Sequence, residues 1–303
     1  MKVFVIIVTY KGKRWYDRCF GSLRQSTIPL QTIVVDNASN DGTVDYIREN
    51  YPEIYLIESK ENLGFGKGNN LGLRYALDHG CDYVFLLNQD AWLEDPDSLS
   101  RLISIAQQYP EYGIISPMQL APDKQSLNIM LEYGDNYYTK RILSDLYCGK
   151  AKEIYETNYV NASAWLLSRE TLSILGGFNP LIFHYGEDDE YLSRARYHGV
   201  KIGICINSRI IHDHETNEVR PYGDELARLS AEDDLELLLD LNRPFDYHGL
   251  RRLWLRRYLK SLFRNNAEER KRAAYKMKYL KKMRSLIEIN RKTNMIKRPN
   301  WIQ

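Results

Sequence analysis

The sequence lacks long apolar stretches and is poor in cysteine. None of its 303 residues belongs to a run of about 18 consecutive apolar residues, so no membrane-spanning helix is predicted. The apolar run at residues 3–8 has no small-residue cleavage site after it, and we interpret it as a buried strand rather than a signal peptide. The four cysteines lie far apart without CxxC spacing, which predicts reduced thiols in a cytoplasmic protein: Cys19, Cys81, Cys148 and Cys205.

Two common phosphate-binding signatures are also missing. There is no Walker A sequence, and no G-x-G-x-x-G segment follows the first strand, which leads into Thr9 and Tyr10. The glycines at 64, 66 and 68 come much later in the chain, and Asn69 follows them directly. A dinucleotide-dependent dehydrogenase is therefore disfavoured. No internal repeat and no low-complexity linker is present.

Charge is distributed unevenly, although the whole chain carries only +2. Residues 245–303 contain 18 Lys and Arg against 4 Asp and Glu, a net of +14, so the other residues carry 2 − 14 = −12. This asymmetry predicts an acidic catalytic part at residues 1–223 and a basic helical extension at residues 224–303.

The first half of the chain alternates strand and helix patterns. Apolar runs predict strands, and segments with helical spacing between them predict helices. This alternation indicates an α/β fold with a single Rossmann-like, mostly parallel sheet. The predicted strands are 3–8, 31–36, 54–58, 83–87, 113–117, 163–168 and 200–206, and the predicted helices are 15–25, 43–50, 66–79, 97–109, 189–198, 224–241 and one or two within 249–290.

Polar residues follow several predicted strands, where ligands of such sheets usually lie. Asp36 and Asn37 end one strand, and the Asp36 carboxylate can accept the ring N–H groups of uracil, thymine or guanine. The same residues also fit a simple Asx-turn with no ligand. The alternating glycines before the next helix are typical of close backbone approach to a phosphate, and equally of a plain turn.

Three further segments carry candidate chemistry. Asp90 follows a buried strand, where a divalent cation with a diphosphate would give its carboxylate a partner. The acidic run at residues 187–190 has aromatic and glycine neighbours, which favours a cleft over a solvated helix start. Seven positions separate Glu187 and Arg194, which can place them on one helix face. His212 and His214 flank an aspartate and fit metal or diphosphate binding, or an ordinary surface loop.

The order of these motifs closely resembles the inverting glycosyltransferases of family 2, in particular the rhamnosyltransferase-like branch that builds bacterial surface polysaccharides. The resemblance covers roughly residues 1–215 and leaves out the basic tail. It is carried by Val8-Thr9-Tyr10, Asp36-Asn37-Ala38-Ser39, Asn62-Leu63-Gly64-Phe65-Gly66, Asn69, Asn88-Gln89-Asp90, Gly177-Phe178, Glu187-Asp188 and His212.

The resemblance implies a GT-A fold, a Mn²⁺ or Mg²⁺ ion and a UDP-, dTDP- or GDP-sugar donor. Asp188 matches the general base, with Glu187 as the alternative, and Asp90 matches the metal-binding acid of the D-x-D motif. Asn88 stands where that motif has its first acid, so His212 or His214 is expected to assist Asp90. The donor-binding positions implied by the match are Thr9, Tyr10, Asp36, Asn37, Asn62, Gly64, Phe65, Asn69 and Gln89.

Alternatives remain for both halves of the chain. A sugar nucleotidyltransferase would need a glycine-rich basic loop after the first strand, and a catalytically weak sugar-nucleotide-binding scaffold would fit the loss of an acid at Asn88. Residues 251–264 alternate basic and apolar pairs around Trp254, which is typical of a helix on an anionic membrane surface. That helix can equally pack on the catalytic domain; no nucleic-acid module is recognisable. The expected acceptor is a growing glycan or lipid-linked glycan, and the expected location is the cytoplasm or the inner face of the plasma membrane.

Overall fold

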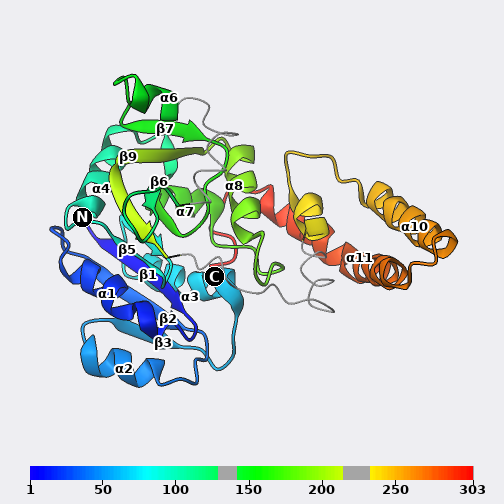
Figure 1. Cartoon of the computed structure of the whole chain (residues 1–303), viewed down its shortest axis with the longest axis horizontal. Coiled ribbons are helices and arrows are strands. Elements are labelled where there is room, and N and C mark those ends of the chain that lie inside the picture. The colour runs from blue at the N-terminus through cyan, green and yellow to red at the C-terminus, as the bar shows by residue number, and fades with distance from the viewer. Residues whose placement is uncertain (129–141, 214–232, 303) are drawn as a thin grey trace. The chain divides into compact units, whose positions relative to one another are not determined.

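A computed structural model describes residues 1–128, 142–213 and 233–302 of the chain. These residues divide into two compact units, residues 1–216 with 298–303, and residues 217–297. The predicted boundary at 223/224 falls within residues 214–232, outside the described residues. The last six residues return to the first unit, where the Asn300 carbonyl accepts a hydrogen bond from the Gly177 N–H at 2.8 Å. Figure 1 marks the C-terminus beside α3 (Gly64–Asp78).

The described strands of the first unit form one nine-stranded sheet in the order β3-β2-β1-β4-β8-β6-β9-β5, with β7 paired to β9. β1, β2, β3, β4, β6 and β9 run in one direction and β5, β7 and β8 in the other, so the sheet is mostly parallel as predicted. The strands are β1 (Val3–Thr9), β2 (Gln31–Asp36), β3 (Tyr55–Glu58), β4 (Tyr83–Leu87), β5 (Ala91–Leu93), β6 (Tyr112–Leu120), β7 (Ile154–Thr157), β8 (Ala164–Ser168) and β9 (Lys201–His212).

Helices cover both faces of this sheet (Figure 1). One core contains apolar side chains of α3, α7 and α8, and the other contains those of α1, α2 and α4. The central strands are apolar on both faces, as sheets buried between two helical layers require. The helices of the first unit are η1 (Lys13–Trp15), α1 (Tyr16–Arg24), α2 (Thr43–Asn50), α3 (Gly64–Asp78), α4 (Ser98–Gln108), α6 (Ile142–Tyr147), α7 (Arg169–Leu175) and α8 (Glu187–Tyr197).

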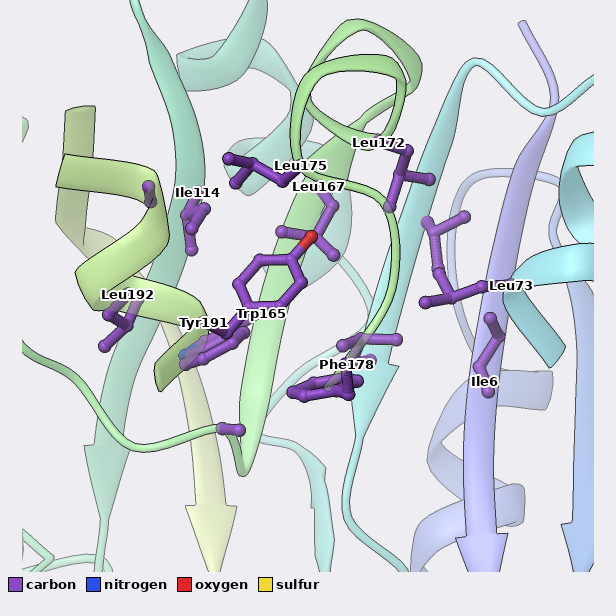
Figure 2. Packing of buried hydrophobic residues seen from close by; sticks show 14 of the residues in the cluster. Ile6, Leu73, Ile114, Trp165, Leu167, Leu172, Leu175, Phe178, Tyr191 and Leu192 are labelled. Atoms are coloured by element: carbon purple, nitrogen blue, oxygen red, sulfur yellow. The ribbon is translucent and has the colours of Figure 1, made fainter. Parts of the chain in front are cut away.

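Aromatic packing fixes α8 against the sheet. Trp165 on β8, Phe178 and Tyr191 on α8 are fully buried, and their ring centroids lie 5.0–6.1 Å apart (Figure 2). Ring pairs at such distances add to the stabilisation that burial alone provides. The Tyr191 hydroxyl also donates to the Gly176 carbonyl at 2.9 Å. These contacts fix the position of α8, whose first turn carries the predicted base.

The second unit contains two long helices, α10 (Tyr247–Phe263) and α11 (Ala267–Asn294), joined by a short turn. A helix was predicted at 224–241. Residues 233–239 of it are helical, residues 240 and 241 are not, and residues 224–232 lie outside the described residues. Trp254 of α10 is buried, and the buried Lys276 ammonium of α11 lies 2.9 Å from the Asp234 carboxylate. No helix in the described ranges is long and apolar enough to cross a bilayer.

Two element boundaries differ from the prediction in ways that matter for the site. α3 begins at Gly64 rather than Gly66, so the glycines lie inside the helix. A side chain at Gly68 would come within 2.9 Å of Val8 on β1, which explains why the close packing of α3 on the sheet needs glycine here. β9 extends to His212, because pairing with β5 places Ala91 opposite His212. His212 is therefore a strand residue and not part of the following loop.

Candidate active site

The carboxyl ends of β1 and β2 bring Thr9 and Asp36 together, because the two residues are partners in the parallel ladder. The Thr9 hydroxyl donates to Asp36 Oδ1 at 3.3 Å, and the Ser39 N–H donates to Asp36 Oδ2 at 2.9 Å. Both side chains are almost completely buried. Asp36 thus fixes the turn after β2, as the Asx-turn interpretation expects, and its contact with a nucleoside stays a prediction.

Asn37 and Asn62 connect the end of β2 to the start of α3. Asn37 Nδ2 donates to the Gly64 carbonyl at 3.1 Å, and its Oδ1 accepts the Leu63 N–H at 3.3 Å. Asn62 Oδ1 accepts the Gly64 N–H at 2.9 Å. Both amides therefore hold the first turn of α3 in place, and their contact with a donor stays a prediction.

Gly64 also brings α3 against the segment that precedes α8. Its φ is +78°, and a Cβ atom there would lie 2.0 Å from the Phe183 carbonyl oxygen, so no larger residue fits. Phe65 packs edge-on against Phe178, with ring centroids 5.6 Å apart. Asn69 is buried and donates to the Phe65 carbonyl at 3.0 Å within the helix. The two segments of the sequence motif set, around 64 and around 187, are thus neighbours in space.

Gln89 holds Tyr10 at the edge of the sheet. Its Oε1 accepts the Tyr10 N–H at 3.0 Å, and its Nε2 donates to the Tyr10 carbonyl at 3.2 Å. The Tyr10 side chain itself is 42% exposed. The Gln89 amide is thus engaged with protein backbone, and Tyr10 is the residue of this pair that is available to a ligand.

Asp90 and His212 face each other across the β5–β9 pair. Asp90 Oδ1 lies 3.5 Å from His212 Nε2, and the His212 carbonyl accepts a hydrogen bond from Asn128 Nδ2 at 3.1 Å. Two ligands at right angles on one Mg²⁺ ion are about 3 Å apart, so a carboxylate and an imidazole at this distance fit one ion. The structure describes no cluster of three or more His, Cys, Asp or Glu residues suited to a metal, and His214 lies outside the described residues. A metal here would take its other ligands from phosphate and water.

Three residues at this edge have a left-handed backbone that is rare for side chains other than glycine. Lys11 follows β1, Ala38 follows β2, and Tyr185 precedes α8, with φ values of 52°, 60° and 64°. Such conformations cost free energy and are found disproportionately at functional sites. Their positions mark the same edge of the unit as the polar residues described above.

Asp188 in the first turn of α8 has the most perturbed carboxylate of the candidate site. Burial, together with the nearby Asp189 and Glu187 carboxylates, raises its pKa to about 7. The Asp189 N–H donates to Asp188 Oδ1 at 3.0 Å and the Tyr159 hydroxyl to Oδ2 at 3.2 Å, and both bonds favour the ionised form. A carboxylate with a pKa near neutrality is suited to accept a proton at physiological pH.

Glu187 is more buried than Asp188 and packs against the start of α3. A Cβ atom at Gly66 would lie 3.8 Å from that of Glu187, and the exposed His184 approaches Glu187 Oε1 to 3.7 Å. Its Oε2 is buried and accepts no hydrogen bond from the described residues. Glu187 is therefore buried beside the first turn of α3, while Asp188 is the half-buried acid.

Arg194, seven positions after Glu187 on α8, pairs with a different acid of the same helix. Arg194 is buried, and its guanidinium pairs with Glu190 one turn earlier, with Nη2 to Oε2 at 3.1 Å. It also donates to the carbonyls of Leu175 and Gly177, the latter at 2.8 Å. Pairing with Glu190, at i, i+4, is favoured because the buried guanidinium can also donate to two backbone carbonyls in that position. This pair stabilises the loop before α8 and takes no part in the exposed site.

Sequence patterns did not identify a row of buried amides beneath this edge. Asn161 Oδ1 accepts hydrogen bonds from Gln119 Nε2 at 2.9 Å and from the Ser163 hydroxyl at 2.6 Å, and Asn128 donates to the His212 carbonyl. Nearby in the chain, the Tyr159 hydroxyl donates to Asp188. Residues 119–158 show only weak helix or strand periodicity, so no sequence pattern pointed to these contacts.

Two hollows of about 490 and 500 Å³ lie elsewhere. The first is lined by Pro29, Gln31 and Tyr55, and the second by Met1, Tyr83 and Gly113. Both are at the amino ends of the parallel strands, opposite the edge that carries the candidate site. Ligands of open α/β sheets bind at the carboxyl ends, and the polar and strained residues gather there.

Comparison with known proteins identifies relatives of this chain. The family model for glycosyl transferase family 2 matches residues 4–150. The low-salt glycan biosynthesis hexosyltransferase Agl10 of Haloferax volcanii is 28% identical over 221 residues, covering 71% of this chain and 68% of that protein. The N-acetylglucosaminyl-diphospho-decaprenol L-rhamnosyltransferase of Mycobacterium tuberculosis is 26% identical over 246 residues, covering 74% and 80%.

A solved structure shares the fold at low sequence identity. The mannosyltransferase PcManGT from Pyrobaculum calidifontis, solved with GDP-Man and Mn²⁺, superposes with a TM-score of 0.54 at 17% identity, covering 97% of this chain and 73% of that one. The predicted GT-A fold is confirmed.

Proposed function

The chain belongs to glycosyltransferase family 2, and from that premise we propose that it is an inverting enzyme that transfers a sugar from a nucleoside-diphosphate donor to a hydroxyl of a glycan or lipid-linked acceptor. The observation that carries this proposal is the Asp188 carboxylate, whose pKa is raised to about 7 at the carboxyl edge of the sheet. An acceptor hydroxyl needs a base of this strength as it attacks the anomeric carbon. In-line attack from the face opposite the diphosphate inverts the configuration of that carbon.

The donor nucleoside is proposed to bind along the ends of β1 and β2. Tyr10 offers an exposed ring for contact with a base, and the carboxylate of Asp36 and the hydroxyl of Thr9 lie next to it at the strand ends. Gln89 and Asn37 support this surface through their bonds to Tyr10 and to the start of α3. Uracil, thymine and guanine, but not adenine, carry the ring N–H that such an acceptor recognises.

Asp90 and His212 are proposed to hold a Mn²⁺ or Mg²⁺ ion, with His214 as a further candidate. Their donor set fits a hard or borderline divalent cation that keeps open positions for phosphate oxygens. The ion would neutralise the charge of the departing nucleoside diphosphate. The Asp90 carboxylate would anchor the ion. Because His212 is buried, its imidazole would hold the ion from the protein side.

A donor screen tests this proposal directly. Nucleoside diphosphate release is measured with UDP-, dTDP- and GDP-sugars, with and without Mn²⁺, and NMR of the product reports the anomeric configuration. A glycosyltransferase releases the diphosphate from one class and gives an inverted product. A nucleotidyltransferase would release pyrophosphate from a nucleoside triphosphate instead. A sugar-nucleotide-binding scaffold would show binding in a thermal shift with no turnover.

We propose that α10 binds an anionic membrane surface, where a lipid-linked acceptor would be found. Three apolar residues of this helix form an outward stripe, with Leu255 47%, Leu259 46% and Leu262 46% exposed, and Phe263 follows at 92%. Trp254, by contrast, is buried within the same unit. Basic residues adjoin the stripe: Arg252, Arg256, Lys260 and Arg264. An exposed apolar stripe with cationic flanks complements an anionic lipid interface, which would place the protein at the inner face of the plasma membrane.

Replacing Leu259, Leu262 and Phe263 together by glutamine is expected to abolish co-sedimentation with vesicles containing anionic lipid. Burial of these side chains supplies the apolar part of the binding free energy, and charge attraction alone is screened by salt. The matched control replaces Tyr275, Leu286 and Ile289 on α11, which are exposed to a similar degree. Equal binding of both variants, or no binding of the wild type at low salt, would rule out this surface.

A further inference from the structure

The segment from Thr157 to Ser163 connects the two halves of the proposed active site. At one end the Tyr159 hydroxyl donates to Asp188 Oδ2 at 3.2 Å. At the other end the Ser163 carbonyl accepts the Asn88 N–H at 2.9 Å, two residues before Asp90. The side chain that touches Asp188 therefore comes from a different part of the chain than the helix that carries this residue.

Tyr159 is held in place independently of Asp188. The buried Thr157 hydroxyl donates to the Tyr159 carbonyl at 2.8 Å and accepts the Tyr159 N–H at 3.3 Å. Arg196 of α8 donates to the carbonyl of the preceding Asn158. Groups that contact a reacting residue act best when their own positions are fixed by other bonds. The Tyr159 hydroxyl thus meets Asp188 from a fixed backbone.

We propose that Tyr159 is a positioning residue that holds the Asp188 carboxylate in the orientation in which it accepts the acceptor hydroxyl proton. The inference rests on the base role proposed above for Asp188. With Oδ2 engaged by Tyr159 and Oδ1 bonded to the Asp189 N–H, the carboxylate is fixed in rotation. The remaining lone pairs then point in defined directions, which is what proton transfer within hydrogen-bond distance requires.

The charges around Asp188 make this role visible in a pH profile. Glu187 and Asp189 face it from its own helix and oppose its ionisation, whereas the Asp189 N–H and Tyr159 favour it. His184 approaches Glu187, and Arg196 lowers the pKa of Asp189, so both act on Asp188 through its neighbours. Loss of the Tyr159 hydroxyl removes a donor to the charged form, and the Asp188 pKa must therefore rise.

The test is the pH dependence of kcat/KM for Tyr159→Phe. The acid limb is expected to move to higher pH by about one unit, because a hydrogen bond to a charged group shifts ionisation by about that amount. At pH 6 the variant should be roughly tenfold slower than wild type, and at pH 9 nearly equal to it. A merely structural role would lower the rate by the same factor at every pH.

Tyr155→Phe is the matched control. Tyr155 lies four residues upstream in β7, is buried, and donates to the Asp145 carboxylate at 3.1 Å, so it loses the same kind of bond away from the site. Its profile should overlay that of wild type. Replacement of Tyr159 by 3-fluorotyrosine keeps the ring and strengthens the donor, and should move the acid limb the opposite way, to lower pH.

The outcomes separate this inference from the proposed function. A superimposable wild-type and Tyr159→Phe profile, or an unchanged limb with 3-fluorotyrosine, overturns the role of Tyr159 while leaving Asp188 as the base. Full turnover in Asp188→Asn would instead overturn the base assignment itself. Opposite shifts in the two Tyr159 variants support the inference.

Discussion

Asp188→Asn is expected to lower glycosyl transfer by about 10²- to 10⁴-fold, the range that a positioned general base contributes. Asparagine keeps the size of the side chain and its Oδ1 can still accept the Asp189 N–H, although the amide nitrogen in place of Oδ2 no longer accepts the Tyr159 hydroxyl. Donor and metal binding should be retained. Turnover is measured as nucleoside diphosphate release with the donor that the screen identifies, and donor binding by thermal shift. The loss should appear in kcat with little change in donor KM.

Two variants check that this loss belongs to Asp188. Glu187→Gln should have a smaller effect, since Glu187 is buried against α3 whereas Asp188 is only half-buried. Asp45→Asn, an exposed acid in the first turn of α2, should leave turnover unchanged. If Glu187→Gln abolished turnover while Asp188→Asn kept it, the base would be Glu187.

Asp188→Asn should also stabilise the folded protein above neutral pH. The folded-state pKa of Asp188 is raised from its ordinary 3.8 to about 7, so the native state binds a proton more tightly than the unfolded chain. Stability from this group is therefore present below pH 4 and lost as pH rises to about 7. Asp188→Asn removes this loss, so its Tm should exceed that of wild type at pH 8 and match it at pH 4. A lower Tm at both pH values would show that the variant is misfolded.

Asp90→Asn is expected to weaken metal-dependent turnover by at least about 10- to 100-fold, the cost measured for losing groups that merely support a metal site. The physical reason is the small ligand set among the described residues, since Asn88 supplies no charge and the Asp90 carboxylate lies 3.5 Å from His212. The measurement is nucleoside diphosphate release across a Mn²⁺ titration, in which the variant should need far more Mn²⁺ for half-maximal rate.

Asp82→Asn is the control for this prediction. Asp90 follows the carboxyl end of β4, whereas Asp82 directly precedes its amino end. There the Asp82 carboxylate lies 3.8 Å from the N-terminal amine. Its titration should match that of wild type. An Asp90→Asn variant with a wild-type Mn²⁺ requirement would place the metal elsewhere or make the reaction independent of it.

The sequence by itself determined the sheet, the order of the motifs and the edge of the sheet at which the motif residues lie. Apolar runs such as Val3–Thr9 can only be buried strands, and each motif residue follows such a run, so Thr9, Asp36 and Asp90 had to gather where parallel strands end. These inferences need only residues that are close together in the sequence, because a strand's apolar pattern and the turn that follows it are both local features. The acidic start of α8 was predicted for the same reason.

The tertiary structure alone decided what each polar side chain does. Gln89 turned to the Tyr10 backbone, Asn37 to the start of α3 and Arg194 to Glu190, because a buried polar group bonds whichever partner folding brings within reach. Tyr159 reached Asp188 across 29 positions from a stretch with no periodic pattern. No local rule encodes such a contact, since its free energy is set by burial and by charges that only meet once the sheet and α8 are packed.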